Sequence, residues 1–145
     1  MKYLDVLRAE LESEIKNAER NLKEARNTRD NAASAMESQH DMTRARAESE
    51  IHMYEEKIRN LTKSIDKIPA ENPKCKEVGL WCLTKIELPE ATMKIVIVPE
   101  NMGGKKVGEI HYISKVTPLG KSIMKKKVGE NFSFSNQAGE IISIA

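Results

Sequence analysis

The sequence predicts an α+β protein, in which a long antiparallel helical hairpin precedes a small antiparallel-sheet domain with one helix. Three observations support this fold class. Apolar residues recur at heptad spacing through the first half of the chain, a segment with two prolines follows at 69–73, and the second half groups β-branched residues into short runs. Of the 145 residues, 32% are charged and 4% are aromatic, which favours a solvated rod and a small domain over one large core.

The first helix is predicted by an apolar seam near the N-terminus. Its members are Leu4, Leu7, Leu11, Ile15, Ala18, Leu22, Ala25 and Ala32. The step from Leu11 to Ile15 departs from a strict heptad and would locally unwind a supercoil. Because the seam becomes rich in alanine toward its end, the two helices of the hairpin can approach closely there.

The second helix follows an uninterrupted heptad. Its apolar members are Ala47, Ile51, Tyr54, Ile58, Leu61, Ile65 and Ile68. Proline lacks a backbone donor, so Pro69 should end this helix and open a linker. Ser38 and Asp41 are both candidate N-caps at its start. At 1.5 Å per residue, the arm from Leu4 to Glu37 would be about 50 Å long, too long to bury itself in this chain.

The remaining chain reads as strands around one short helix. Strands are expected within 77–88, 92–100, 106–116, 130–135 and 140–145. Thr117 is the expected N-cap of the helix over 117–127, with Pro118 at its first position. We therefore divide the chain into a hairpin domain at 1–70, with an acidic tip at 36–42, and a sheet domain at 75–145.

Motifs that the sequence lacks limit which cellular compartment and which enzyme classes we expect. Cys75 and Cys82 do not form a CxxC pair, so we expect two reduced thiols in a cytoplasmic protein. No apolar run reaches the length of a membrane span or a signal peptide. The sequence contains no phosphate loop, GxGxxG, GxSxG or HExxH motif, which argues against an enzyme acting alone.

The stretch "MESQHDMTRAR", residues 36–46, carries the charge expected at the hairpin tip. In one interpretation, Glu37 and Asp41 only stabilise the start of the second helix, where the helix dipole favours negative charge. In the other, they deliver two carboxylates into a partner's cavity. Mg²⁺ takes one or two carboxylates plus water, so an exposed pair would bind it effectively only where a partner supplies further ligands.

Two segments carry a resemblance to a known family. "ISKVTPLGKSIMKKKVGE" is similar to the C-terminal signature of the Gre family of bacterial transcript cleavage factors, and "MYEEKIRNLTKSI" is similar to the descending helix of that family's hairpin. The resemblance covers nearly the whole chain. It implies a coiled-coil hairpin with an acidic tip and an FKBP-like C-terminal domain that docks on RNA polymerase.

The resemblance also implies roles for individual residues. Glu37 falls at the family's metal-binding carboxylate, while the second acidic position falls on His40, with Asp41 one residue later. Glu37 and Asp41 would complete a Mg²⁺ site held jointly with the polymerase. Thr117 and Pro118 match the element associated with polymerase contact. The charges of Arg44 and Arg46 could steer phosphate.

Three hypotheses follow. The first is a transcription elongation factor that enters the secondary channel of RNA polymerase and stimulates Mg²⁺-dependent cleavage of the backtracked RNA 3′ end. It would be a cytoplasmic, monomeric accessory factor and not an enzyme by itself. The second is a cleavage-inactive regulator or inhibitor that occupies the same channel, since "MESQHDMTRAR" departs from the family's usual tip. The third is a coiled-coil scaffold whose heptads form a dimer.

Overall fold

The computed structural model describes residues 3–32 and 38–145, with the side chains of 38–41 left out. The chain forms two compact units. We call Arg8–Lys67 the hairpin unit, and Met1–Leu7 together with Ile68–Ala145 the sheet unit. The described residues 3–7 group with the sheet unit, although they directly precede the hairpin unit in the sequence. Among the described residues, no helix is long and apolar enough to cross a membrane.

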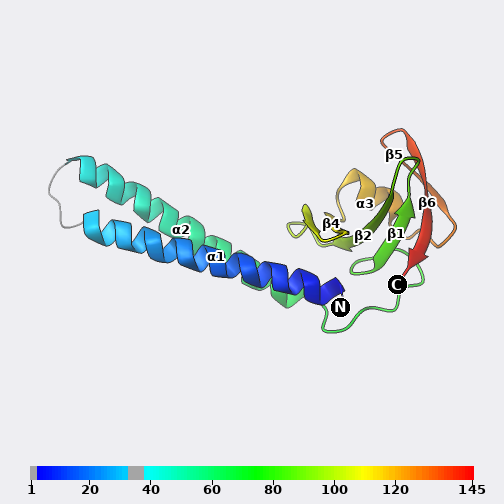
Figure 1. The fold of residues 1–145 in the computed structure, drawn as a ribbon, viewed down its shortest axis with the longest axis horizontal. Helices are drawn as coiled ribbons and strands as arrows, with labels where there is room; N and C mark the ends of the chain where they lie inside the picture. The colour runs from blue at the N-terminus through cyan, green and yellow to red at the C-terminus, as the bar shows by residue number, and fades with distance from the viewer. Residues whose placement is uncertain (1–2, 33–37) are drawn as a thin grey trace. The chain divides into compact units, whose positions relative to one another are not determined.

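The hairpin unit is built from two long helices, α1 (Tyr3–Ala32) and α2 (Ser38–Lys67), which run side by side (Figure 1). Only the part of α1 from Arg8 onward belongs to this unit. Leu22, Ala25 and Ile51 form its buried cluster, against which Tyr54 and Ile58 pack. These residues all belong to the predicted apolar seams, so the heptad interpretation is confirmed. Opposite charges also meet between the helices, where Arg26 Nη2 lies 3.6 Å from Glu55 Oε2.

The ends of α2 agree with only part of the sequence analysis. The helix ends at Lys67, two residues before Pro69, as expected. It begins at Ser38, one of the two predicted cap positions. Asp41 lies inside the first turn of this helix, so the alternative that made Asp41 the N-cap is wrong. A carboxylate in a first turn is still favourable, because the unpaired N–H groups there carry positive partial charge.

The sheet unit holds six strands in the order β3-β4-β2-β1-β6-β5. Their bounds are β1 (Leu83–Glu87), β2 (Thr92–Val98), β3 (Lys105–Val107), β4 (Ile110–Ser114), β5 (Asn131–Phe134) and β6 (Gln137–Ile144). The strand pairs are antiparallel except β2–β4, which is parallel. The α+β class with a mainly antiparallel sheet is confirmed, and the parallel pair β2–β4 is the feature that the sequence did not reveal.

The predicted strand over 106–116 is in fact a hairpin of β3 and β4. Gly108 has a φ of 61°, which a residue without Cβ adopts at little cost, and it reverses the chain between Val107 and Ile110. In the sequence, this glycine lies inside a run whose composition favours a single strand. The resulting edge strand is short.

The helix α3 (Pro118–Ile123) is shorter than the predicted 117–127. The chain leaves the helix at Met124, and Lys125 then takes a φ of 67°. Inside the helix, Gly120 lies against the preceding loop, since a Cβ built there would be 2.5 Å from the Ser114 carbonyl oxygen. This close approach is what lets such a short helix sit directly after β4.

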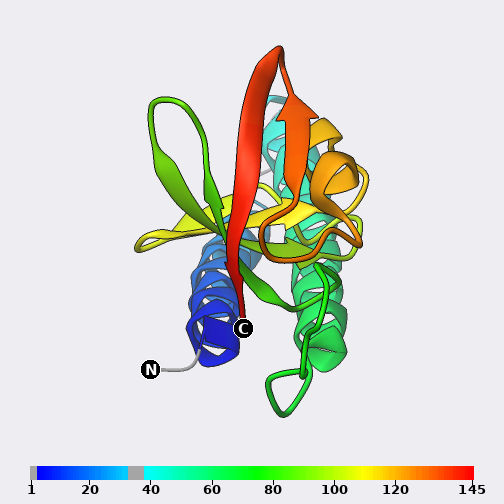
Figure 2. The ribbon, with the colours of Figure 1, turned by 90° about the vertical axis from the view of Figure 1, so that its right-hand side faces the viewer.

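The helix α3 lies beside the sheet in the ribbon views (Figures 1 and 2). The main core of the sheet unit is formed by residues of α3 and of the sheet strands. Its fully buried members include Ile86, Ile95, Ile97, Ile123 and Ile141. Phe132 closes the cluster beside β6, and there Gly139 leaves room for its ring, because a Cβ would be 2.3 Å from Phe132 Cζ. Because α3 packs against the sheet through this core, the start of α3 has a defined position in the sheet unit.

The first residues of α1 are tied to the sheet unit by tyrosine hydroxyls. Tyr112, which is fully buried, donates to the Tyr3 carbonyl at 2.7 Å, and Tyr3 donates to the Trp81 carbonyl at 2.5 Å. Burial raises the pKa of Tyr112 to about 12, with the nearby Tyr3 adding to the effect. These two bonds explain why residues before Arg8 group with the sheet unit.

Candidate functional site

The acidic tip is only partly within the described residues. Glu37 lies outside them, and His40 and Asp41 lie in the first turn of α2 with their side chains outside them. The metal-binding role of Glu37 and Asp41 therefore stays a prediction. Within the described part of the chain, no group of three or more His, Cys, Asp and Glu side chains is arranged to hold a metal ion.

Two arginines follow the tip on α2. Arg44 Nε lies 3.3 Å from Glu48 Oε1, one turn further along, and about half of each side chain is exposed. An exposed pair of this kind is worth less than about 1 kcal/mol, so the guanidinium can exchange its partner for a phosphate at little cost. Arg46 is exposed, and so is Met42, whose side chain is 74% exposed.

A polar cluster lies further along the hairpin unit. Arg26, Arg29, Glu48, Ile51, His52 and Glu55 line a hollow of about 290 Å³. The Glu55 carboxylate makes two contacts in this cluster: it pairs with Arg26 and lies 4.0 Å from His52 Nδ1. The cluster balances its own charges and so offers no net charge to a ligand.

The start of α3 has the local structure that the sequence predicted. Thr117 is the N-cap: its Oγ1 accepts a hydrogen bond from the Gly120 N–H at 3.1 Å and donates one to the Ser114 carbonyl at 2.8 Å. Pro118 occupies the first helical turn and is exposed. The Thr117 hydroxyl therefore already makes one donated and one accepted hydrogen bond within the fold. Pro118 is the member of the pair that a partner can contact.

The exposed surface around Pro118 combines apolar and basic groups. Val116 is 44% exposed, and Lys115 and Lys121 are exposed close to Pro118 in the sequence. Val128, beyond the end of α3, is 57% exposed. We call Val116, Pro118 and Lys121 the α3 surface. Sequence reasoning found its centre through the Thr-Pro signal but did not identify the exposed valines, because isolated valines in a strand-rich segment are usually buried.

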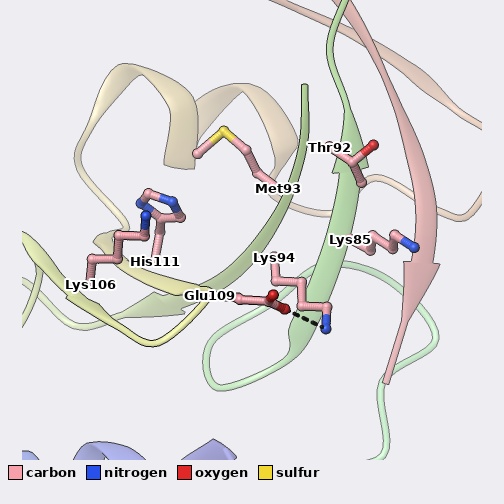
Figure 3. Close-up of a pocket in the computed structure, with 7 residues that line it drawn as sticks. All are labelled: Lys85, Thr92, Met93, Lys94, Lys106, Glu109 and His111. Atoms are coloured by element: carbon pink, nitrogen blue, oxygen red, sulfur yellow. Dashed lines mark hydrogen bonds and ion pairs between the residues drawn. The ribbon is translucent and has the colours of Figure 1, made fainter. Parts of the chain in front are cut away.

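A cleft of about 520 Å³ opens on the sheet (Figure 3). It is lined by Lys85, Thr92, Met93, Lys94, Lys106, Glu109 and His111, and Lys94 Nζ lies 3.4 Å from Glu109 Oε2. The strand register places Lys85 beside Lys94 and Lys106 beside His111. It also pairs His111 with Ile95, the residue after Lys94, so the two basic pairs lie on opposite faces of the sheet. They do not converge on one anion.

The cysteines differ from expectation. Cys75 and Cys82 form a disulfide, with 2.03 Å between the sulfurs and 6.1 Å between the Cα atoms, so the prediction of two reduced thiols is wrong. The chain turns back between them: the Cys82 N–H bonds to the Gly79 carbonyl at 3.3 Å, and Trp81 adopts a φ of 67°. This turn, which the spacing did not reveal, brings the two Cα atoms within disulfide distance.

Comparison with known proteins gives a structural likeness only. No family model matches the chain, and no curated protein matches it. Similar solved structures include the GreA factor homolog 1 (Gfh1) protein of Thermus thermophilus, at 17% identity and a TM-score of 0.43, covering 95% of this chain and 94% of that one. Thermus aquaticus Gfh1 is also 17% identical, with a TM-score of 0.44 and coverage of 97% and 94%. At these values the likeness does not establish a family.

Proposed function

We propose that this protein is a transcription elongation factor of the Gre type, acting on a bacterial-type RNA polymerase as an accessory factor. The observation that carries the proposal is the hairpin unit. Two helices of 30 residues each, about 45 Å long at 1.5 Å per residue, bury only a narrow apolar seam against each other. Such a rod suits insertion into a channel of a large partner.

The tip would carry the chemistry. In the sequence, Glu37 directly precedes α2, and Asp41 is the fourth residue of that helix. We infer that both carboxylates would lie at the same end of the hairpin. Carboxylates are the right donors for Mg²⁺, and two are too few for a strong site. We infer that the polymerase supplies the remaining ligands. When bound, Mg²⁺ would activate water for cleavage of the backtracked RNA 3′ end.

The other candidate residues have supporting roles. Arg44 and Arg46 follow the tip on the same helix and would attract the RNA phosphates, with Arg44 leaving Glu48 to do so. The α3 surface, with the exposed Pro118 at its centre, would dock on the outside of the polymerase. The protein would act in the cytoplasm, where bacterial-type RNA polymerase works. It would act as a monomer, since each apolar seam already packs against the other helix.

The deciding experiment adds the protein to a backtracked elongation complex with Mg²⁺ and measures RNA shortening. We expect cleavage by the wild type and almost none by Glu37→Gln/Asp41→Asn, with unchanged binding to the polymerase. Glu56→Gln/Asp66→Asn is the matched control, because it removes two carboxylates elsewhere on α2. Binding without cleavage by the wild type would instead indicate a channel-blocking inhibitor. A dimer in sedimentation that fails to bind polymerase would indicate a scaffold.

A further inference from the structure

The disulfide lies where the linker after α2 joins the sheet unit. Cys75 belongs to the linker, two residues after Pro73, and Cys82 directly precedes β1 at Leu83. The ring that it closes contains the buried residues Val78 and Trp81. The two ends of this ring are held to the sheet unit in different ways.

The later part of the ring is anchored without help from the sulfurs. The Val78 N–H donates to the Lys126 carbonyl and the Lys125 N–H donates to the Val78 carbonyl, both at 2.8 Å. The Trp81 N–H donates to the Ile97 carbonyl at 2.8 Å, and the Trp81 carbonyl accepts from the Tyr3 hydroxyl. Residues 78–82 would therefore keep their place if the disulfide were opened.

The earlier part is held mainly by the disulfide. Among the described residues, no backbone hydrogen bond joins residues 70–77 to the rest of the sheet unit. Lys74 and Lys76, on either side of Cys75, are exposed. The disulfide is thus the covalent link that fastens this segment, which we call the stapled linker (residues 70–77).

The surroundings of the sulfurs accommodate both oxidation states. Cys75 Sγ lies 3.6 Å from the Pro73 carbonyl oxygen, and Cys82 Sγ lies 3.7 Å from the Leu80 carbonyl oxygen. Disulfide sulfurs carry no proton, so in the oxidised protein these are only contacts. After reduction each thiol would have a carbonyl acceptor within reach as a weak S–H donor. Opening the bond therefore leaves neither thiol without a polar partner.

We propose that Cys75–Cys82 is a reversible redox modification site, which fastens the stapled linker when oxidised and releases it when reduced. The inference does not depend on the proposed function. Intracellular disulfides are typically transient and redox-sensing, which would reconcile an oxidisable pair with a protein of the cytoplasm. The ring is short, so closing it removes less chain entropy from the unfolded state than closing a long loop would.

The reaction partners are a dithiol for opening and a disulfide such as oxidised glutathione for closing. A thiolate of the dithiol attacks the half-buried Cys75 Sγ, because Cys82 is only 5% exposed. A mixed disulfide forms, and Cys82 leaves as a thiolate that takes up a proton. The second thiolate of the dithiol then displaces Cys75, which is protonated in turn, and two electrons have passed to the protein.

Limited trypsin digestion of the full chain tests the proposal. The oxidised and the dithiothreitol-treated protein are digested in parallel, quenched, fully reduced and analysed by mass spectrometry. We expect cleavage after Lys74 and Lys76 to be at least fivefold faster in the reduced protein, while cleavage after Lys127 is unchanged. Cys75→Ser/Cys82→Ser should match the reduced wild type and show no response to dithiothreitol.

A second measurement follows the equilibrium itself. The full chain is incubated with mixtures of reduced and oxidised glutathione, and its free thiols are then alkylated. Mass spectrometry measures the fraction with the disulfide, while circular dichroism reports the fold. We expect complete and reversible conversion with an unchanged spectrum. Three results would overturn the proposal: equal cleavage rates in the two states, no disulfide in oxidised glutathione, or loss of the sheet unit's spectrum on reduction.

Discussion

The Tyr112 hydroxyl donates a 2.7 Å hydrogen bond to the Tyr3 backbone carbonyl, joining residues 109 positions apart in the sequence. Tyr112 lies on β4, between the edge strand β3 and β2, and is fully buried. Its partner belongs to the first turn of α1, whose remaining turns lie in the hairpin unit. One helix thus serves both units, and the bond secures its first turn to the sheet unit.

Removing this hydroxyl should weaken the sheet unit. Tyr112→Phe keeps the ring but removes the hydroxyl's bond to the Tyr3 carbonyl, which we expect to cost about 1 kcal/mol in the free energy of unfolding. Urea denaturation measures the change. Tyr54→Phe, a half-buried position on α2, is the control and should fall within about 0.5 kcal/mol of the wild type. An unchanged midpoint for Tyr112→Phe would show that the bond contributes nothing.

The raised pKa of Tyr112 predicts a loss of stability in alkali. Tyrosine is neutral when protonated, so a pKa raised from 10.0 to about 12 means that the folded protein holds this proton more tightly than the unfolded chain does. The corresponding stability is present below pH 10 and is lost as the pH rises toward 12. We expect urea midpoints to fall over that range, and to fall less steeply for Tyr112→Phe. Parallel curves would contradict this assignment.

The secondary structure was largely predictable because its signals are local. Heptad spacing identified the buried residues of α1 and α2, and Pro69 identified the end of α2. Thr117 and Pro118 identified the start of α3, because both a cap and a first-turn proline act within one helical turn.

What failed depends on residues distant in sequence or on backbone angles. The parallel pairing of β2 with β4 is a tertiary choice that alternation within each strand cannot reveal. The turn at Gly108 and the fold-back before Cys82 need left-handed backbone angles, which a glycine permits but does not require, and which Trp81 adopts without being a glycine. The tip stays a prediction, because Glu37 and the side chain of Asp41 lie outside the described residues.

Gly120 should not tolerate a side chain. In Gly120→Ala, the new Cβ would lie 2.5 Å from the Ser114 carbonyl oxygen and 3.0 Å from Thr117 Oγ1, so α3 must shift away from the loop. We expect a loss of roughly 1–3 kcal/mol in thermal or urea unfolding. Gly79→Ala is the matched control, since its Cβ would have only Cys82 Sγ nearby at 3.9 Å. Equal stability of the two variants would mean that α3 adjusts without cost.

Thr84 offers a stabilising change. It is fully buried in β1, and its hydroxyl has no hydrogen-bond partner among the described residues. Thr84→Val keeps the shape and removes the unsatisfied group, so we expect a gain of about 1 kcal/mol in the free energy of unfolding. Thr92→Val, at an exposed position of β2, should change stability little. A loss of stability in Thr84→Val would show that the hydroxyl is bonded, for example to a buried water.

Pro118 separates docking from folding on the α3 surface. The residue is exposed in the first turn of α3, where an introduced carboxylate is compatible with the helix dipole. Pro118→Asp should therefore retain the fold, with a change in unfolding free energy within about 1 kcal/mol. If the α3 surface docks on RNA polymerase, the new charge beside the exposed Val116 should lower affinity at least tenfold, because it must lose water on binding.

Glu90→Asp, an exposed change away from α3, should bind like the wild type. Affinity measured by fluorescence anisotropy with labelled protein decides the matter: equal binding by Pro118→Asp and the wild type would remove the α3 surface from the interface.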